Sequence, residues 1–313
     1  MTDTTPTESN LSGLDRKDFQ KNINSRKTDL YILKNAQGME VAVINYGCAI
    51  LSIMVPDKNG KFANVILGHD SIEHVINSPE PFLSTTIGRY GNRIANGKFT
   101  LYGEEHQLTV NNGPNSLHGG PTGFHARVWD AVQPNESTVI FNYTSADGEE
   151  GFPGTLEIEM TYRLEDEANA LVIEYRATTD KATVVNLTNH GFFNLAGISN
   201  PSPTVLNNIL TINADFYVPI DEVSIPTGEI LKVENTPMDF RTPHAIGERI
   251  DDKFQQLVNG AGYDHCYVLN KAESGELSLA ATCTEPVSGR TMEVYTTETV
   301  SYTHLTLPTN REV

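Results

Sequence analysis

The chain has 313 residues, with 22 Lys or Arg and 40 Asp or Glu, which gives a formal net charge of −18 at pH 7. A charge this negative argues against nucleic acid or an anionic membrane as a partner, so a neutral ligand is the expected one. No run of 18 apolar residues predicts a transmembrane helix. The three cysteines, Cys48, Cys266 and Cys283, are too few for a disulfide framework and are expected to be small buried apolar side chains.

The first 26 residues form a polar N-terminal segment that we expect to be frayed. The segment begins without the basic region and apolar stretch of a secretory signal. The sequence therefore favours a cytoplasmic protein, with a periplasmic or secreted protein as the alternative if the natural N-terminus differs.

Short runs of alternating apolar and polar residues follow from residue 28 onward. In 156–164 every second residue is apolar, and the alternation resumes at 171–176 after a polar turn, which predicts an antiparallel hairpin. Similar runs predict strands at 29–34, 40–45, 50–55, 64–67, 137–143, 183–187, 208–212, 265–269, 277–284 and 290–296. Asn-Gly, Asp-Gly and Ser-Gly pairs between many of these runs predict turns.

Helical periodicity is scarce in the sequence. The best example is 246–257, preceded by Thr242 as an N-cap, and one further turn is expected within 70–76. Strands without intervening helices favour antiparallel packing over parallel strand-helix-strand units. We therefore expect an all-β chain, a large antiparallel β-sandwich with few short helices, folded as a single domain over 27–298.

Two loops depart from the strand pattern. Residues 86–94 hold two arginines and two glycines, which predicts either a surface loop or guanidinium groups that bind a polar ligand. In 111–120, His118 stands beside two glycines, where the backbone can approach another group closely. A lone histidine in such a loop is more often structural or exposed than catalytic.

The segment 186–195 combines amides, a hydroxyl and His190 with two phenylalanine rings, a composition that suits a sugar. The alternative interpretation is a capped strand end with core phenylalanines. A smaller group, 262–265, contains Asp264, which either accepts a hydrogen bond from a hydroxyl or closes a turn.

Residues 186–195 resemble the active-site signature of the aldose 1-epimerases, or galactose mutarotases: Asn or Ser, any residue, Thr-Asn-His, any residue, Tyr, Phe or Trp, Asn, Leu or Ile. One position departs, because Phe192 stands where the family has Tyr. Four further family segments follow the same order as in the family: 88–94, 115–120, 262–265 and 294–298. The resemblance covers roughly residues 20–298 and implies a galactose mutarotase-like β-sandwich.

The resemblance implies that the chain interconverts the α and β anomers of free hexoses such as glucose and galactose. One group takes the proton of the C1 hydroxyl while another protonates the ring oxygen, and no metal or organic cofactor is required. His190 matches the family's acid at the ring oxygen, and His118 matches a second histidine beside that oxygen. Asn92, Arg93 and Asp264 match residues that hold sugar hydroxyls.

The family's catalytic glutamate has no recognisable match in this chain. Glu298 belongs to an earlier motif and Glu312 has different neighbours, so the base is assigned to neither. Residues 299–313 carry no family pattern, and we expect this tail to be foreign to the family. A chain without that glutamate would be an inactive relative of the family. The alternative function is carbohydrate binding without catalysis by a β-sandwich.

Two other enzyme classes stay open on the residues alone. A zinc hydrolase would use His118 and His190 with His265 or Asp264, but no close His-x-His pair supports it. A glycoside hydrolase would need paired carboxylates in the acidic turn 147–150, Asp147 with Glu149 or Glu150, where a solvated surface is the simpler interpretation.

The expected partner is a neutral monosaccharide, an aldose, which fits the strong negative charge. We expect the chain to be a monomer or a homodimer.

Overall fold

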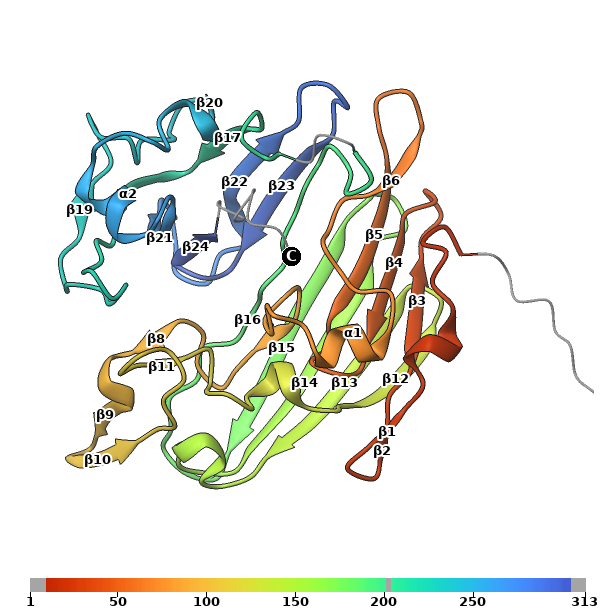
Figure 1. Ribbon diagram of the computed structural model, residues 1–313, viewed down its shortest axis with the longest axis horizontal. Helices are drawn as coiled ribbons and strands as arrows, with labels where there is room; N and C mark the ends of the chain where they lie inside the picture. Colours follow the sequence, from red (N-terminus) through yellow and green to blue (C-terminus); the bar gives the residue numbers. More distant parts are fainter. Residues whose placement is uncertain (1–9, 201–203, 305–313) are drawn as a thin grey trace, which may run out of the picture. The chain divides into compact units, whose positions relative to one another are not determined.

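The computed structural model describes residues 10–200 and 204–304. The chain divides into two compact units (Figure 1). Unit 1 takes in the described part of Met1–Val55 together with Phe62–Gly191, and unit 2 takes in Pro56–Lys61 and the described part of Phe192–Val313.

Unit 1 is built on two four-stranded antiparallel sheets. The first has the order β3 (Leu30–Lys34), β4 (Glu40–Ile44), β5 (Ile50–Pro56) and β6 (Phe62–Asn64). The second has the order β12 (Asp130–Asn135), β13 (Thr138–Ser145), β14 (Leu156–Leu164) and β15 (Leu171–Thr179). The rings of Tyr31 on β3 and Phe141 on β13 pack edge to face, with their centroids 6.0 Å apart, which joins the two sheets.

The predicted hairpin is confirmed by β14 and β15, which pair from Leu156 opposite Thr179 to Leu164 opposite Leu171. Along β14 the alternate residues from Leu156 to Leu164 are all buried, while the residues between them are half-buried or exposed. Because strand side chains alternate between faces, this pattern places one face of the sheet in the core. Burial of each apolar side chain of this size stabilises the folded state by about 1.5–3 kcal/mol.

Shorter elements of unit 1 surround these sheets. Four strand pairs are present: β1 (Asn22–Ile23) with β2 (Arg26–Lys27), β7 (Thr86–Ile87) with β16 (Thr188–Asn189), β8 (Arg93–Ile94) with β11 (Ser116–Leu117), and β9 (Lys98–Leu101) with β10 (Glu104–Gln107). The helical segments are η1 (Arg16–Phe19), α1 (Ile72–Ile76), η2 (Ala95–Gly97), η3 (Phe124–Ala126) and η4 (Glu149–Gly151).

The N-terminal segment is folded from residue 10 onward, so the expectation of a frayed segment up to residue 26 is wrong for this part, while residues 1–9 lie outside the described residues. The reason is Phe19, which is 0% exposed and packs in a core cluster with Ile44, Leu51 and Ile72. The carboxylate of Asp15 caps the start of the short helical segment Arg16–Phe19 by accepting a hydrogen bond from Lys17 N–H (3.0 Å).

Unit 2 contains two further four-stranded sheets. One has the order β20 (His244–Ala245), β17 (Ile209–Ile212), β22 (Ser278–Thr284) and β23 (Thr291–Thr296). The other has the order β19 (Leu231–Lys232), β18 (Ala214–Tyr217), β21 (Asp264–Leu269) and β24 (Val300–His304). The helical segments are η5 (Ile246–Glu248) and α2 (Gln255–Asn259).

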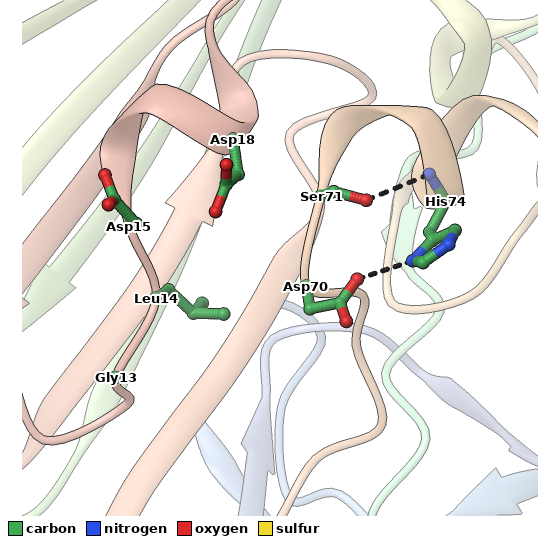
Figure 2. Close-up of a pocket in the computed structure, with 7 residues that line it drawn as sticks. All are labelled: Gly13, Leu14, Asp15, Asp18, Asp70, Ser71 and His74. Carbon is green, nitrogen blue, oxygen red and sulfur yellow. Dashed lines mark hydrogen bonds and ion pairs between the residues drawn. The ribbon is translucent and has the colours of Figure 1, made fainter.

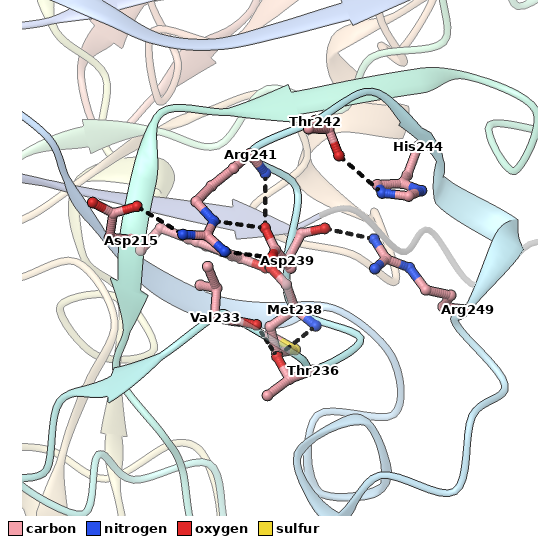
Figure 3. A network of polar contacts seen from close by, with 10 residues as sticks. Asp215, Val233, Thr236, Met238, Asp239, Arg241, Thr242, His244 and Arg249 are labelled. Carbon is pink, nitrogen blue, oxygen red and sulfur yellow. Dashed lines mark hydrogen bonds and ion pairs between the residues drawn. The ribbon is translucent and has the colours of Figure 1, made fainter.

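Polar contacts hold the irregular chain that links β19 to β20 (Figure 3). Arg241 donates two hydrogen bonds to the Asp239 carboxylate, from Nε (3.0 Å) and Nη2 (2.8 Å), and pairs with Asp215 through Nη1 (3.3 Å). Arg249 donates to the Asp239 carbonyl oxygen (2.7 Å). These bonds give hydrogen-bond partners to backbone and side-chain groups that do not take part in strand pairing. Phe240, between Asp239 and Arg241 in the sequence, is buried.

The expected fold class is confirmed, because both units are built from antiparallel strands and the two α-helices among the described residues have five residues each. No helix in the described part of the chain is long and apolar enough to span a membrane. The single domain expected over 27–298 stays a prediction. The same holds for the foreign tail over 299–313, in which β24 pairs with β21 and residues 305–313 lie outside the described residues.

Three local predictions are wrong. Residues 183–187 are irregular and the strand begins at Thr188. The strand expected at 64–67 occupies Phe62–Asn64 instead. The helix expected over 246–257 is split into η5 and α2, because Arg249 is drawn out of helical geometry toward the Asp239 carbonyl oxygen, a contact distant in the sequence.

Candidate active site

The first part of the signature segment, residues 186–191, belongs to unit 1 and runs beside the arginine-containing loop. Asn186 N–H donates to the Arg89 carbonyl (2.9 Å), and Gly91 N–H donates to the Asn186 carbonyl (2.8 Å). The Asn186 side chain also donates from Nδ2 to the Gly91 carbonyl (3.1 Å). The first residue of the signature therefore fixes the loop that leads to Asn92 and Arg93.

His190 is held through its backbone on both sides. Its N–H donates to the Thr85 carbonyl (2.9 Å), and its carbonyl accepts from Ser84 N–H (3.0 Å). The two residues before it form β16, which pairs with β7. This short ladder presents the half-buried imidazole at the end of the strand.

His118 follows β11, and its ring is fixed by the neighbouring loop. Asn92 N–H donates to His118 Nδ1 (3.0 Å), and His118 N–H donates to the Asn92 carbonyl (3.1 Å). Because Nδ1 accepts a hydrogen bond, the neutral ring carries its proton on Nε2. His118 is only 6% exposed, so its backbone position and its tautomer are both set by Asn92.

The two histidines predicted from the sequence lie against each other. The ring centroids of His118 and His190 are 5.1 Å apart, with an interplanar angle of 86°. The ring of Phe82 packs on the same pair, 4.8 Å from His118 and 6.2 Å from His190. Phe82 also lies 4.7 Å from His125, whose burial lowers its pKa to about 4 and keeps it neutral near pH 7.

Arg93 begins β8 beside this pair, opposite Leu117 on β11. Its Nε donates to Asn112 Oδ1 (2.9 Å), and its N–H donates to Asn92 Oδ1 (2.8 Å). A guanidinium held through Nε has a fixed plane, which suits directional hydrogen bonds to a polar ligand. Asn92, Arg93, His118 and His190 are therefore brought together in unit 1.

The glycine after His118 is required by close backbone packing. Gly119 has φ +84°, and a Cβ at this position would lie 1.9 Å from the Gly88 carbonyl oxygen. The backbone therefore approaches the arginine loop more closely than any side chain permits. The first of the two glycines after His118 has this physical cause.

Asp264, the fifth predicted residue, is the first residue of β21 in unit 2 and is 8% exposed. Its N–H donates to His265 Nδ1 (3.2 Å). His265 is 0% exposed, its Nε2 contacts Gln256 Oε1 (3.1 Å), and burial lowers its pKa to about 4. A buried neutral imidazole thus supports the backbone that carries Asp264.

The zinc hydrolase hypothesis finds no support in this geometry. Both ring nitrogens of His265 are occupied by contacts inside unit 2. Within residues 10–200 and 204–304, no group of three His, Cys, Asp or Glu side chains is arranged to hold a metal ion.

The acidic turn of the glycosidase hypothesis has structural contacts instead. Asp147 pairs with Lys181 and accepts from Gly154 N–H (2.6 Å), and these contacts lower its pKa. Glu149 accepts from Tyr143 Oη (2.6 Å). The Glu150 carboxylate accepts from Thr122 N–H (3.0 Å) and hydroxyl, and so anchors the loop that follows His118.

A cavity of ≈ 350 Å³ lies elsewhere on unit 1 (Figure 2). It is lined by residues of the N-terminal turn and of α1, including Asp15, Asp18, Asp70, Ser71 and His74. Several of these groups cap the two short helices, as Asp15 caps η1 and Ser71 accepts from His74 N–H (3.4 Å). None of the predicted site residues lines this cavity.

Sequence reasoning missed Phe82, which contacts the three imidazoles from a loop without any pattern.

The chain is similar in sequence to known proteins. The family model described as aldose 1-epimerase matches residues 29–309. The galactose mutarotase of Bos taurus is 42% identical over 260 residues, 83% of this chain and 72% of that protein. The aldose 1-epimerase of Escherichia coli K12 is 40% identical over 269 residues, 86% of this chain and 75% of that protein.

Among solved structures, the GalM/aldose epimerase homologue from C. elegans has a TM-score of 0.76 and 30% identity, covering 85% of this chain and 78% of that one. Fold similarity and sequence similarity therefore point to the same family. The chain belongs to the aldose 1-epimerase family.

Proposed function

We propose that this chain is an isomerase that interconverts the α and β anomers of free aldoses, including glucose and galactose. The observation that carries the proposal is the contact between His118 and His190, whose ring centroids lie 5.1 Å apart. The His118 ring accepts a hydrogen bond from Asn92 N–H, and the backbone of His190 is held by Ser84 and Thr85. The family match and the relatives at 40–42% identity support the same reaction.

In the proposed reaction His190 donates a proton to the ring oxygen of the pyranose while a base removes the proton of the C1 hydroxyl. The bond between C1 and the ring oxygen breaks, and an open-chain aldehyde forms. Rotation about the C1–C2 bond exposes the other carbonyl face, and the same proton transfers in reverse close the other anomer. An imidazole suits this cycle because it gives up and regains a proton near neutral pH.

His118 is proposed to assist at the ring oxygen as a hydrogen-bond donor. Its Nδ1 is engaged by Asn92 N–H, so the neutral ring directs an N–H from Nε2. Asn92, Arg93 and Asp264 are each proposed to hold sugar hydroxyls, as the family resemblance implies. No glutamate is assigned as the base, so the activity of this chain is the quantity to measure.

Polarimetry tests the proposal directly. Freshly dissolved α-glucose and α-galactose are followed with and without protein, in a weakly buffered solution that keeps the uncatalysed rate low. The proposal requires mutarotation faster than in buffer alone, in proportion to protein concentration. Binding of the sugar by calorimetry with no rate increase would instead establish the alternative, a non-catalytic carbohydrate-binding sandwich.

We further infer a cytoplasmic location and a monomeric or homodimeric state. A periplasmic or secreted protein is the alternative. Light scattering coupled to size-exclusion chromatography measures the oligomeric state, and a mass above that of a dimer contradicts it.

A further inference from the structure

A buried phenol connects the core sheet of unit 1 to the signature segment. Tyr162 on β14 is 0% exposed. Its hydroxyl donates to the Cys48 carbonyl oxygen (2.8 Å) and accepts from Asn189 Nδ2 (2.8 Å). A buried hydroxyl with a donor and an acceptor on opposite sides has one orientation, which fixes both of its partners.

Asn189 is the residue immediately before His190, and it stands opposite Thr86 in the pairing of β16 with β7. Thr86 in turn donates from its hydroxyl to Met160 Sδ (2.9 Å). Met160 and Tyr162 are two residues apart on β14, so both point to the same face. The short two-stranded ladder is therefore attached to the core sheet at each of its strands.

This attachment matters because β7 and β16 have only two residues each. A ladder this short can tilt about its own axis, and the backbone bonds of His190 to Ser84 and Thr85 would tilt with it. A side-chain bond that runs from the ladder to a long, buried strand removes that freedom. An imidazole that transfers a proton must be held to within a fraction of an ångström of its productive position.

We propose that Tyr162 is a positioning residue for His190, acting through the hydrogen bond from Asn189 to its phenolic oxygen. The part of this inference that concerns catalysis rests on the proposed function. Tyr162 does not touch the substrate, so its removal changes the presentation of the imidazole rather than the binding of the sugar.

The first test compares Tyr162→Phe with Tyr143→Phe. Tyr162→Phe keeps the ring and removes the oxygen that binds Asn189. Tyr143→Phe is the matched control, since it also deletes a hydrogen-bonded hydroxyl in the same sheet, one that donates to Glu149 (2.6 Å). We expect kcat to fall between about 10- and 100-fold in Tyr162→Phe with KM within about twofold, and to stay unchanged in Tyr143→Phe. Equal kcat values in both variants overturn the proposal.

The second test needs no activity and so separates this inference from the proposed function. Ring resonances of labelled histidine are assigned with His190→Gln, and their chemical shifts are compared in the absence of sugar. The His190 signals shift in Tyr162→Phe and stay in place in Tyr143→Phe. If the wild-type chain shows no mutarotation, the proposed function fails while this comparison still decides the positioning role. Unmoved His190 signals contradict it.

A variant at the other end of the hydrogen bond covers the case in which Tyr162→Phe does not fold. Asn189→Ala alone removes the same hydrogen bond from the other side, and it shifts the same His190 signals. Where both single variants fold, the double variant shifts those signals, and lowers kcat, no further than the more severe single change. Additive effects show that the two residues act independently and refute the coupling.

Discussion

The two histidines of unit 1 are held in different ways. His118 accepts a hydrogen bond at Nδ1 from Asn92 N–H, so protonation of this nitrogen would lose the bond (3.0 Å). His190 is fixed through its backbone by Ser84 and Thr85. These contacts fit the proposed division of roles, in which His118 donates a hydrogen bond and His190 exchanges a proton.

Replacement of His190 tests this division of roles at the residue scale. His190→Ala should lower kcat about 10²- to 10⁴-fold, because one general acid is lost. Polarimetric kcat at saturating sugar measures the effect, with circular dichroism as the check on folding. A variant that keeps nearly full kcat removes His190 from the role of acid.

Replacement of Arg93 should act mainly on binding. Its guanidinium is oriented by Asn112 (2.9 Å), and a group that holds sugar hydroxyls equally in ground and transition states affects KM. Arg93→Ala should therefore raise KM with little change in kcat. Arg163→Ala, which removes a surface arginine paired with Glu165 (2.6 Å), is the control and should leave both constants unchanged. An unaltered KM for every aldose tried argues against Arg93 as a sugar contact.

At the scale of elements, the loop after β11 depends on contact between backbones. Gly119 lies so close to the Gly88 carbonyl that no Cβ fits, and its φ is +84°. Gly103, in the turn between β9 and β10, has φ +86°, and a Cβ at this position would meet nothing within 4 Å. The two glycines share a backbone conformation and differ in crowding, so they separate the two effects.

Gly119→Ala should destabilise the protein more than Gly103→Ala. The strain of a positive φ costs about 1–2 kcal/mol at either position, and only Gly119→Ala adds a clash with backbone. Urea unfolding followed by the fluorescence of Trp129, the one tryptophan of the chain, measures both free energies. Equal losses of stability would show that the loop relaxes away from Gly88 at no cost. Gly119→Ala should also lower kcat, since His118 must move with the loop.

At the scale of the whole molecule, two buried histidines predict a loss of stability on acidification. His125 in unit 1 and His265 in unit 2 have their pKa values lowered to about 4 by burial, against 6.5 ordinarily. The unfolded chain therefore binds more protons than the folded chain between these values, and stability falls as the pH drops from about 6.5 to 4. Each histidine contributes at most about 1.4 kcal/mol per pH unit.

Urea midpoints between pH 7 and pH 4.5 measure this dependence. Each of His125→Gln and His265→Gln should make the decline shallower, because a group that titrates differently in the two states has been removed. A variant whose decline matches that of the wild-type chain shows that its histidine is not held neutral by burial.

The connection between the two units predicts a single cooperative transition. The turn Pro56–Lys61 links β5 to β6 of unit 1 yet belongs to unit 2. There Lys58 N–H donates to the Ser288 carbonyl (3.0 Å), and Arg290 donates to the Lys61 carbonyl (3.1 Å). Unfolding of unit 2 therefore releases a turn of the first sheet of unit 1, which is the physical basis for expecting one domain over 27–298.

Two probes measure this cooperativity. Trp129 is buried in unit 1 and reports on it by fluorescence. Cys283 reports on unit 2, since burial raises its pKa to about 11 and a protected thiol reacts only after opening. The urea midpoints from fluorescence and from labelling of Cys283, read by mass spectrometry of its own peptide, should coincide. Separate midpoints would establish two domains in place of one.

Local patterns in the sequence were sufficient for much of the fold and for naming the candidate site residues, whose roles stay predictions. The alternation in 156–164 predicted β14, and the Thr-Asn-His run led to His190, because period and motif are properties of neighbouring residues. The sequence could not indicate that Thr188 rather than Thr183 begins a strand, since that depends on pairing with β7 about 100 residues earlier. It also assigned to one site Asp264 and four residues of unit 1, which the structure describes in different units.

The sequence by itself determined the fold class, the family and the residues able to exchange a proton or bind a hydroxyl. The tertiary structure alone decided the contact of His118 with His190, the tautomer set by Asn92, and the bond between Tyr162 and Asn189. The physical reason is the distance along the chain over which each effect acts. Propensity and alternation act over a few residues, whereas the direction and protonation of a side chain depend on partners that only chain folding brings within about 3 Å.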